Sequence, residues 1–371
     1  MHDAAPDSVS TRLAEHIARE IDAAGGWIGF DRFMALALYA PGLGYYSRNA
    51  RQFGWFPASG SDFVTAPELT PLFGKALARQ VAQALHACGA DEVYEFGAGS
   101  GALAEQLLDA LGETVRRYTI VDLSGALRER QQRRLGAFGD RVRWVETWPQ
   151  TLRAVVVGNE VLDAMPVKLL HWDGMQWFER GVVTGGPGAA FAYSNRTTAL
   201  RPPSDEPLEP RFVPGTTIEI HPQAEAFIAT LAERLDRGAA FFIDYGFPQA
   251  EYYHPQRTGG TLMCHRAHVA DSDPLVAVGD KDITAHVSFS AIALAGQEAG
   301  LDVLGYTTQA RFLMNCGLLE DLHGADARSL AAAQKLINEH EMGELYKVIG
   351  FGKKCAFDAL GFLAGDRTHR L

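Results

Sequence analysis

The sequence has no long hydrophobic run and no excess of positive charge. Its longest nearly continuous apolar stretch, residues 33–40, is far shorter than the roughly 20 residues that span a bilayer, so no membrane insertion is expected. The first ten residues are acidic and contain no apolar segment, which indicates no signal or transit peptide. Because 34 Lys and Arg stand against 45 Asp and Glu, the net charge is −11, and we expect no nucleic-acid partner.

Cysteine is also scarce. The four cysteines are widely spaced and form no Cys-x-x-Cys pair: they are Cys88, Cys264, Cys316 and Cys355. This pattern favours a reducing, cytoplasmic compartment and argues against a disulfide framework and a structural zinc. The histidines near Cys264 have poor ligand spacing, so no metal site is expected. Neither a Gly-x-Ser-x-Gly motif nor a P-loop lysine is present, so hydrolase and kinase functions have no support.

The chain does have the composition of an ordinary globular protein, with 47% hydrophobic and 21% charged residues. Its 371 residues suffice for two to three domains or for one large domain with insertions. From residue 91 onward, short apolar segments alternate with helical ones. The apolar segments are 91–97, 118–124, 141–146 and 153–160, and the helical ones are 103–111 and 127–135. This alternation is typical of βαβ units and a parallel sheet.

The alternation is then interrupted by insertions. Two alternating segments joined by Asp173-Gly174 predict a hairpin, and residues 183–215 have the composition of a loop. A helix over about 222–235 and strands over 238–246, 300–309 and 343–352 resume the pattern. We therefore predict an α/β fold with a seven-stranded, Rossmann-like sheet.

The same patterns divide the chain into regions. Three helices are predicted near the N-terminus, the first capped by Ser8 or Ser10 and the last over 67–86. The predicted regions are a helical N-terminal region over 1–87 that covers the cofactor cleft, a core over 88–165 and 236–355, an inserted hairpin with loops over 166–235, and a second insert on the substrate side over 247–287.

The most informative motif ends the first predicted strand, where Glu95 is followed by three alternate glycines. Glycines at such a turn allow a ligand to lie against the backbone at a helix N-terminus. The second strand ends in Asp122, at the spacing typical of a carboxylate that binds ribose hydroxyls. The fourth strand ends in Asn159-Glu160, and in a doubly wound sheet the ends of the first and fourth strands border one crevice. These groups together predict a nucleoside-type site.

The glycine-rich turn has three interpretations. It can be only a tight strand-to-helix connection, or it can be the looser dinucleotide fingerprint of an NAD-dependent oxidoreductase. Two features favour S-adenosylmethionine instead. The Glu95 carboxylate would repel a pyrophosphate but attract a sulfonium or an α-amino group. The Glu-x-Gly-x-Gly-x-Gly spacing and the two trailing strands resemble class I methyltransferases.

Further motifs resemble those of the MidA-like family of class I methyltransferases, which includes a mitochondrial methyltransferase of complex I assembly. The similar segments cover nearly the whole chain and are 39–46, 62–68, 73–74, 95–101, 158–167, 243–246, 260–262 with His268, and 282–287. Cys264-His265 departs from the family pattern, in which an aromatic residue is expected. The resemblance implies S-adenosylmethionine as cofactor and a protein arginine as methyl acceptor. A bacterial protein that can form a homodimer is expected.

Candidate site residues follow from these motifs. Glu160 and Asp163 can hold a guanidinium, although a helix N-terminal carboxylate and an N-cap are their structural alternatives. Asp244 and Tyr245 either line the acceptor side, as catalytic residues, or only end a strand. The cofactor-binding candidates are Glu95, Gly97, Gly99, Ser100, Gly101, Asp122, Leu123, Asn159 and Glu160. The substrate-binding candidates are Asp62, Thr65, Glu68, His268 and His286.

Several of these candidates have a second explanation. Thr65 and Glu68 also fit a helix capping box, and His286 also fits a buried core histidine. Trp148 can flank an adenine or pack in the core. The arginines of 128–143 can bind an acidic partner or form a solvated helix face. At the level of the whole protein, a cofactor-binding assembly chaperone without turnover is a further alternative to a methyltransferase.

Overall fold

The computed structural model describes residues 8–47, 65–122, 125–203, 212–266 and 269–371. The chain forms two compact units, each made of three chain segments. The first unit contains residues 1–63, 164–224 and 249–288, and the second contains residues 64–163, 225–248 and 289–371. Within the described residues, no helix combines the length and the apolar character needed to cross a membrane.

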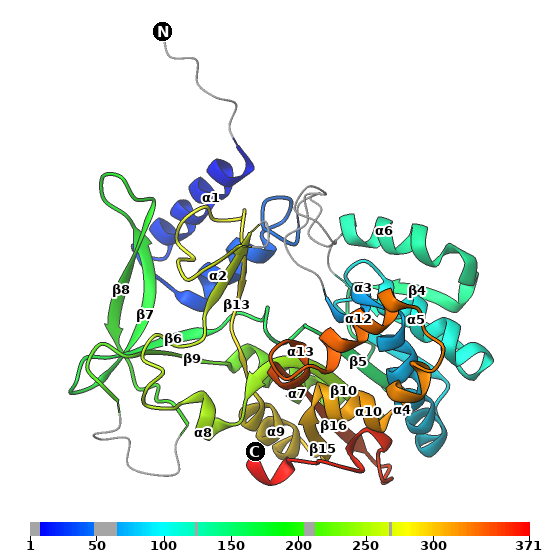
Figure 1. Cartoon of the computed structure of the whole chain (residues 1–371). Helices are drawn as coiled ribbons and strands as arrows, with labels where there is room; N and C mark the ends of the chain where they lie inside the picture. The colour runs from blue at the N-terminus through cyan, green and yellow to red at the C-terminus, as the bar shows by residue number, and fades with distance from the viewer. Residues whose placement is uncertain (1–7, 48–64, 123–124, 204–211, 267–268) are drawn as a thin grey trace. The chain divides into compact units, whose positions relative to one another are not determined.

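The described part of the first unit combines three helices with two small sheets (Figure 1). Its elements are α1 (Val9–Ala23), β1 (Ile28–Gly29), α2 (Phe30–Tyr39), β6 (Lys168–Trp172), β7 (Trp177–Thr184), β8 (Phe191–Thr197), β9 (Thr217–Ile220), α8 (Gln249–Tyr252), β11 (Met263–Arg266), β12 (Val269–Asp271), β13 (Asp282–Thr284) and β14 (Val287–Ser288). One sheet has the order β1-β7-β6-β9 with β8 beside β7, and the other has the order β12-β11-β13. Ser8 caps α1 by accepting a hydrogen bond from the Thr11 amide, as predicted.

The predicted hairpin is present, because β6 and β7 pair antiparallel around Asp173-Gly174. The expectation that 183–215 is only loop is wrong, since β8 pairs with β7 along its whole length. Only its first residue, Phe191, is buried, and the others are partly or fully exposed, so β8 carries only the weak signal of a solvent-facing strand.

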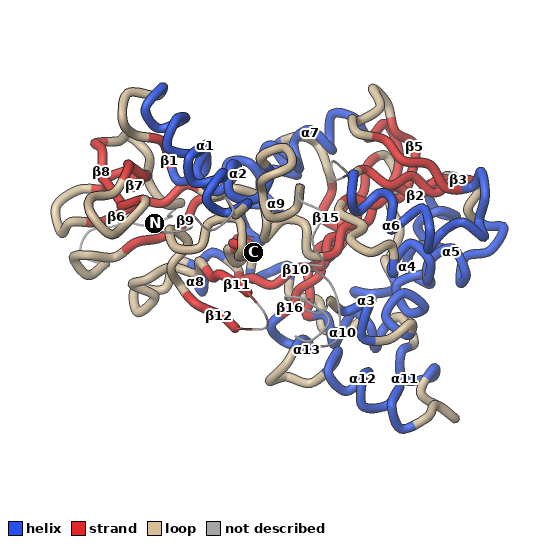
Figure 2. The backbone as a smooth tube through the Cα atoms, turned by 90° about the horizontal axis from the view of Figure 1, so that it is seen from above, coloured by secondary structure: helices blue, strands red, loops and turns tan. Residues whose placement is uncertain are grey.

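The second unit is an α/β layer structure built on one sheet (Figure 2). Its helices are α3 (Ala66–Leu69), α4 (Leu72–Cys88), α5 (Ala102–Leu111), α6 (Gly125–Leu135), α7 (Pro222–Arg234), α9 (Phe289–Glu298), α10 (Gln309–Asn315), α11 (Leu318–Asp321), α12 (Ala327–Ile337) and α13 (Met342–Leu345). The part of α7 that belongs to this unit begins at Glu225. Its strands are β2 (Glu92–Phe96), β3 (Arg117–Val121), β4 (Val142–Val145), β5 (Leu152–Asn159), β10 (Leu235–Phe247), β15 (Asp302–Thr308) and β16 (Tyr346–Lys353).

The order of these strands is β15-β16-β10-β5-β2-β3-β4. The strands from β10 to β4 are parallel, whereas β16 is antiparallel to both of its neighbours. The predicted α/β class is therefore confirmed. Seven strands form the main path of this sheet and one short strand pairs off that path, so the exact count of seven is not confirmed.

The predicted helix over 67–86 is two helices. Thr70 is extended, with φ −162° and ψ 144°, and it separates α3 from α4. The residue before a proline is disfavoured in the helical region, and Pro71 follows Thr70 directly. The packed face of α4, which includes Phe73, Leu77 and Val81, is buried in the core of the second unit.

A disulfide joins Cys88, at the end of α4, to Cys355, just after β16. The sequence argument against disulfides did not foresee it, because the two cysteines are 267 positions apart and only the sheet topology brings them together. Cys264 and Cys316 are buried free thiols.

Candidate active site

The glycine-rich loop joins β2 to α5 and has the backbone that only glycine adopts easily. Gly97, Gly99 and Gly101 have φ values of 63°, 53° and 84°. A Cβ at Gly97 would lie 3.0 Å from the Val161 side chain, and one at Gly101 would lie 3.5 Å from Gln131. Val161 and Gln131 therefore pack against the loop, and Gly101 is the N-cap of α5. This is the form of turn that cradles a ligand at a helix N-terminus.

Glu95 lies just before this loop and is almost completely buried, with 2% of its surface exposed. The Tyr118 hydroxyl donates to its carboxylate over 2.8 Å. Burial raises the pKa of Glu95 to about 8, and the nearby charge of Asp122 adds to this rise, whereas the hydrogen bond from Tyr118 opposes it. A cation bound beside this carboxyl would favour its charged form.

Asp122 follows β3 directly, and its amide donates to the Val145 carbonyl over 3.3 Å. Its Oδ2 accepts a hydrogen bond of 2.8 Å from the Gln131 side chain. Parallel pairing of β2 with β3 brings Asp122 to the same end of the sheet as the glycine-rich loop. Leu123, the next cofactor candidate, lies outside the described residues.

Asn159 and Glu160 end β5, between β2 and β10. Glu160 has a positive φ of 55°, which is uncommon for a residue with a side chain and marks a constrained turn. Its carboxylate accepts from the Asn159 amide over 3.0 Å and from the Tyr346 hydroxyl over 3.1 Å. Asn159 is 9% exposed, and its Oδ1 has no hydrogen-bond partner among the described residues.

Burial raises the pKa of Glu160 to about 8, and the negative charge of Asp163 adds to this effect. The hydrogen bonds from Tyr346 and Asn159 act in the opposite direction. No helix follows β5 here, since residues 161–166 form bends and turns. The structural alternatives, a helix N-terminal carboxylate at Glu160 and an N-cap at Asp163, are therefore wrong.

Asp244 holds this turn in place. Its Oδ2 accepts from the backbone amides of residues 161, 162 and 163 over 3.1, 2.9 and 3.3 Å, and its Oδ1 accepts from the Tyr245 amide over 3.0 Å. Burial and the charges of Asp163 and Glu160 raise the pKa of Asp244 well above its usual value. The Tyr245 hydroxyl donates to Asp163 over 2.5 Å. These contacts favour the structural interpretation of Asp244, and the catalytic roles of Asp244 and Tyr245 stay predictions.

Glu68, on α3, reaches the glycine-rich loop. It accepts a hydrogen bond from the Ser100 hydroxyl and forms an ion pair of 3.1 Å with Arg134. Thr65 precedes α3 but makes no side-chain capping bond, so the predicted capping box is wrong. Asp62 lies outside the described residues.

His286 lies in the first unit, where its amide donates to the Thr261 hydroxyl over 3.1 Å. The neighbouring Glu219 is buried and accepts from the Thr261 and Leu262 amides over 2.9 and 3.0 Å. This carboxylate therefore secures the turn that contains Thr261. His268 lies outside the described residues, and the roles of both histidines stay predictions.

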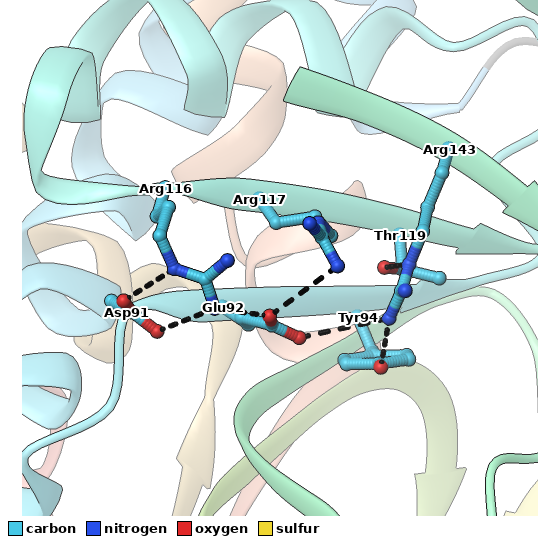
Figure 3. Close-up of polar contacts among 7 residues, drawn as sticks. All are labelled: Asp91, Glu92, Tyr94, Arg116, Arg117, Thr119 and Arg143. Atoms are coloured by element: carbon cyan, nitrogen blue, oxygen red, sulfur yellow. Dashed lines mark hydrogen bonds and ion pairs between the residues drawn. The ribbon is translucent and has the colours of Figure 1, made fainter. Parts of the chain in front are cut away.

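Trp148 packs between aromatic side chains, with ring centroids 4.4 Å from Phe96 and 5.2 Å from Phe227. These contacts favour the core-packing interpretation of this residue. Arginines of the 128–143 run also have internal partners. Arg143, for example, donates to Tyr94 over 2.6 Å and to Thr119 over 2.8 Å, within the polar cluster that Figure 3 shows. Arg143 therefore links β4 to β2 and β3. This contact supports neither of the two interpretations of the arginine run, an acidic partner or a solvated helix face, at this position.

Comparisons with known proteins place this site in a family. Residues 76–307 match the model of a family described as S-adenosyl-L-methionine-dependent methyltransferases. The chain belongs to this family.

Two solved structures from Burkholderia thailandensis are similar over 100% of both chains. One, solved bound to S-adenosyl-homocysteine, is 50% identical with a TM-score of 0.94, and the other, a native structure, is 47% identical with a TM-score of 0.88. The protein arginine methyltransferase NDUFAF7 of Danio rerio, a mitochondrial protein, is 27% identical and aligns over 92% of this chain and 86% of its own length.

The cofactor of this methyltransferase is therefore S-adenosylmethionine. The residues present fit that group, because the glycine turn has the required backbone and buried carboxylates suit a positively charged ligand. The comparisons do not favour the oxidoreductase and chaperone alternatives.

Proposed function

We propose that this methyltransferase acts on an arginine side chain of a protein, with Glu160 and Asp163 as the carboxylates that bind the guanidinium. The arrangement of these carboxylates at the end of β5 carries the proposal. The names of the similar mitochondrial proteins, which are protein arginine methyltransferases, support it. The proposed cofactor residues are those that surround the glycine-rich turn, namely Glu95, Gly97, Gly99, Ser100, Gly101, Asp122, Leu123 and Asn159.

The two carboxylates are held by separate tyrosines. Tyr346 donates to Glu160 and Tyr245 donates to Asp163, and the two rings pack edge to face with centroids 5.4 Å apart. Asp244 fixes the backbone of the intervening turn. A guanidinium presents N–H groups in a fixed planar fork, so a rigid pair of acceptors can orient it with little loss of freedom on binding.

When bound, S-adenosylmethionine supplies a methyl group on a positively charged sulfur. Glu160 and Asp163 would accept hydrogen bonds from guanidinium nitrogens and hold the attacking nitrogen in line with that methyl. Methylation would form an N–C bond as the bond between sulfur and the methyl carbon breaks, and the sulfur would leave as a neutral thioether. The same nitrogen must lose one proton so that the methylated guanidinium carries a single charge. We assign that proton to Glu160, whose buried carboxyl has a raised pKa in the absence of ligand and so binds a proton more tightly than an exposed glutamate does.

The test combines the full-length enzyme, isotopically labelled S-adenosylmethionine and a protein extract from cells that lack the gene. Mass spectrometry should find labelled methylarginine in at least one protein. Glu160→Gln should reduce the rate of labelling by about 100-fold or more, because the amide cannot take a proton, while S-adenosylhomocysteine binding changes little.

Glu113→Gln is the matched control, since Glu113 is exposed and follows α5 away from these carboxylates. It should leave labelling unchanged. Label found only on residues other than arginine would overturn the acceptor class. Full activity of Glu160→Gln would overturn the role of this carboxylate.

A further inference from the structure

Gln131, on α6, is a buried amide that touches both halves of the proposed cofactor site. Its side chain is completely buried, with 0% exposed. Its Nε2 donates to the Gly99 carbonyl over 3.0 Å and to Asp122 Oδ2 over 2.8 Å. Its Oε1 accepts from the Trp144 indole over 2.9 Å. The loop after β2, the end of β3 and strand β4 thus meet on one side chain.

The chemistry of the partners fixes the orientation of this amide. An indole N–H can only donate, whereas a carbonyl and a carboxylate can only accept. The amide oxygen of Gln131 must therefore face Trp144, and its nitrogen must face Gly99 and Asp122. Both amide hydrogens are then used, and neither is left for a ligand. Because its side chain is also completely buried, Gln131 offers the cofactor no hydrogen-bond donor and would act through its neighbours.

The backbone packing leads to the same conclusion. A Cβ at Gly101 would lie 3.5 Å from both Cα and Cγ of Gln131, so the glycine-rich loop rests directly on this residue. Because of this contact and the two donated hydrogen bonds, the loop cannot shift relative to Asp122 without breaking a buried polar contact. A buried donor left without an acceptor is costly.

We propose that Gln131 is a positioning residue that holds Asp122 and the glycine-rich loop in the one relative placement that binds the nucleoside part of the cofactor. The proposal rests on the proposed function of Asp122 as a cofactor residue. No helix-cap, turn or glycine pattern in the sequence singles out Gln131, which lies in an arginine-rich helical segment nine positions after Asp122.

The test measures S-adenosylhomocysteine binding by calorimetry for Gln131→Met, Asp122→Ala and the double variant. Methionine keeps the volume but removes all three hydrogen bonds. We expect each single variant to bind about tenfold or more weakly, the range of a lost hydrogen bond to a charged group. Because Gln131 acts partly through Asp122, the loss of affinity in the double variant should be smaller than the sum of the two single losses.

Gln80→Met is the matched control. Gln80 is also completely buried and uses both its amide nitrogen and its amide oxygen, since it donates to Gln83 and accepts from the Gly361 amide, but it lies on α4. It should lower the melting temperature and leave S-adenosylhomocysteine affinity unchanged. If Gln131→Met does not fold, Trp144→Phe removes the indole donor that orients the amide, together with part of the ring that packs against the core, and should weaken binding severalfold.

The possible failures are distinct. If Asp122→Ala binds as wild type, the proposed function of Asp122 is wrong. If Asp122→Ala is weakened but Gln131→Met is not, or if the two losses add in full, the positioning role of Gln131 is wrong. If Gln131→Met has a lower melting temperature but binds S-adenosylhomocysteine as tightly as wild type, Gln131 only packs in the core and does not position the site.

Discussion

Glu95→Gln should make the ligand-free enzyme more stable at alkaline pH and weaken its binding of the cofactor. Glutamine has nearly the same shape as glutamate and keeps an oxygen that can accept from the Tyr118 hydroxyl. It lacks only the ability to ionise. In wild type the carboxyl is buried, and its pKa is raised from 4.5 to about 8. The folded protein therefore binds this proton more tightly than the unfolded chain does.

The sign of the pH dependence follows from that difference. The contribution of Glu95 to stability is fully present below about pH 4.5 and is lost as the pH rises through about 8. At about 1.4 kcal/mol for each tenfold change in proton affinity, the loss amounts to at most about 5 kcal/mol. Relaxation around the charge reduces this figure, so we expect Glu95→Gln to gain about 2–3 kcal/mol at pH 8.5. For a chain of 371 residues, that gain corresponds to an increase in melting temperature of about 3–4 °C.

Thermal unfolding of both proteins between pH 5 and pH 8.5, without ligand, checks the expectation. The two melting temperatures should agree at pH 5 and separate as the pH rises, with exposed Glu113→Gln behaving as wild type throughout. At the same time, Glu95→Gln should bind S-adenosylhomocysteine more weakly. A constant difference between the two proteins over the whole pH range would refute the reasoning, because it would leave the ionisation of Glu95 without any effect.

Two further substitutions test the backbone of the site. Gly97→Ala should reduce S-adenosylhomocysteine affinity at least tenfold by calorimetry, because its φ of 63° is strained for alanine and the added Cβ would lie 3.0 Å from Val161. Asp244→Ala should destabilise the fold by about 2–4 kcal/mol in urea unfolding and also lower kcat, because three buried amides of the turn lose their acceptor. Wild-type values in either variant would contradict the assigned role.

The sequence predicted the layer structure of the second unit because its signals are local. Strand β5 is an almost unbroken apolar run that ends in Asn159, and glycines mark the turn after β2. The break at Thr70-Pro71 was also readable in principle, since proline restricts the residue before it. Parallel pairing then necessarily places the ends of β2, β3 and β5 at one edge of the sheet.

What the sequence did not reveal depends on distant partners. Tyr346 follows Glu160 by 186 positions, and only the pairing of β16 with β10 brings its hydroxyl to that carboxylate. The Cys88–Cys355 bond has the same origin. The role of Asp244 was undecided for a related reason, because a carboxylate at a strand end can face a ligand or backbone amides. Only the coordinates show that both of its oxygens accept from amides.

The electrostatics of the site favour a cationic ligand over an anionic one. Glu95, Glu160 and Asp244 all have raised pKa values, chiefly because burial removes water from their carboxylates. Neighbouring carboxylates raise these values further, so the ligand-free site disfavours every additional negative charge. A pyrophosphate would intensify that repulsion, whereas a sulfonium, an ammonium or a guanidinium would relieve it. The methyl donor and the proposed acceptor are both cations, so one set of buried carboxylates suits both.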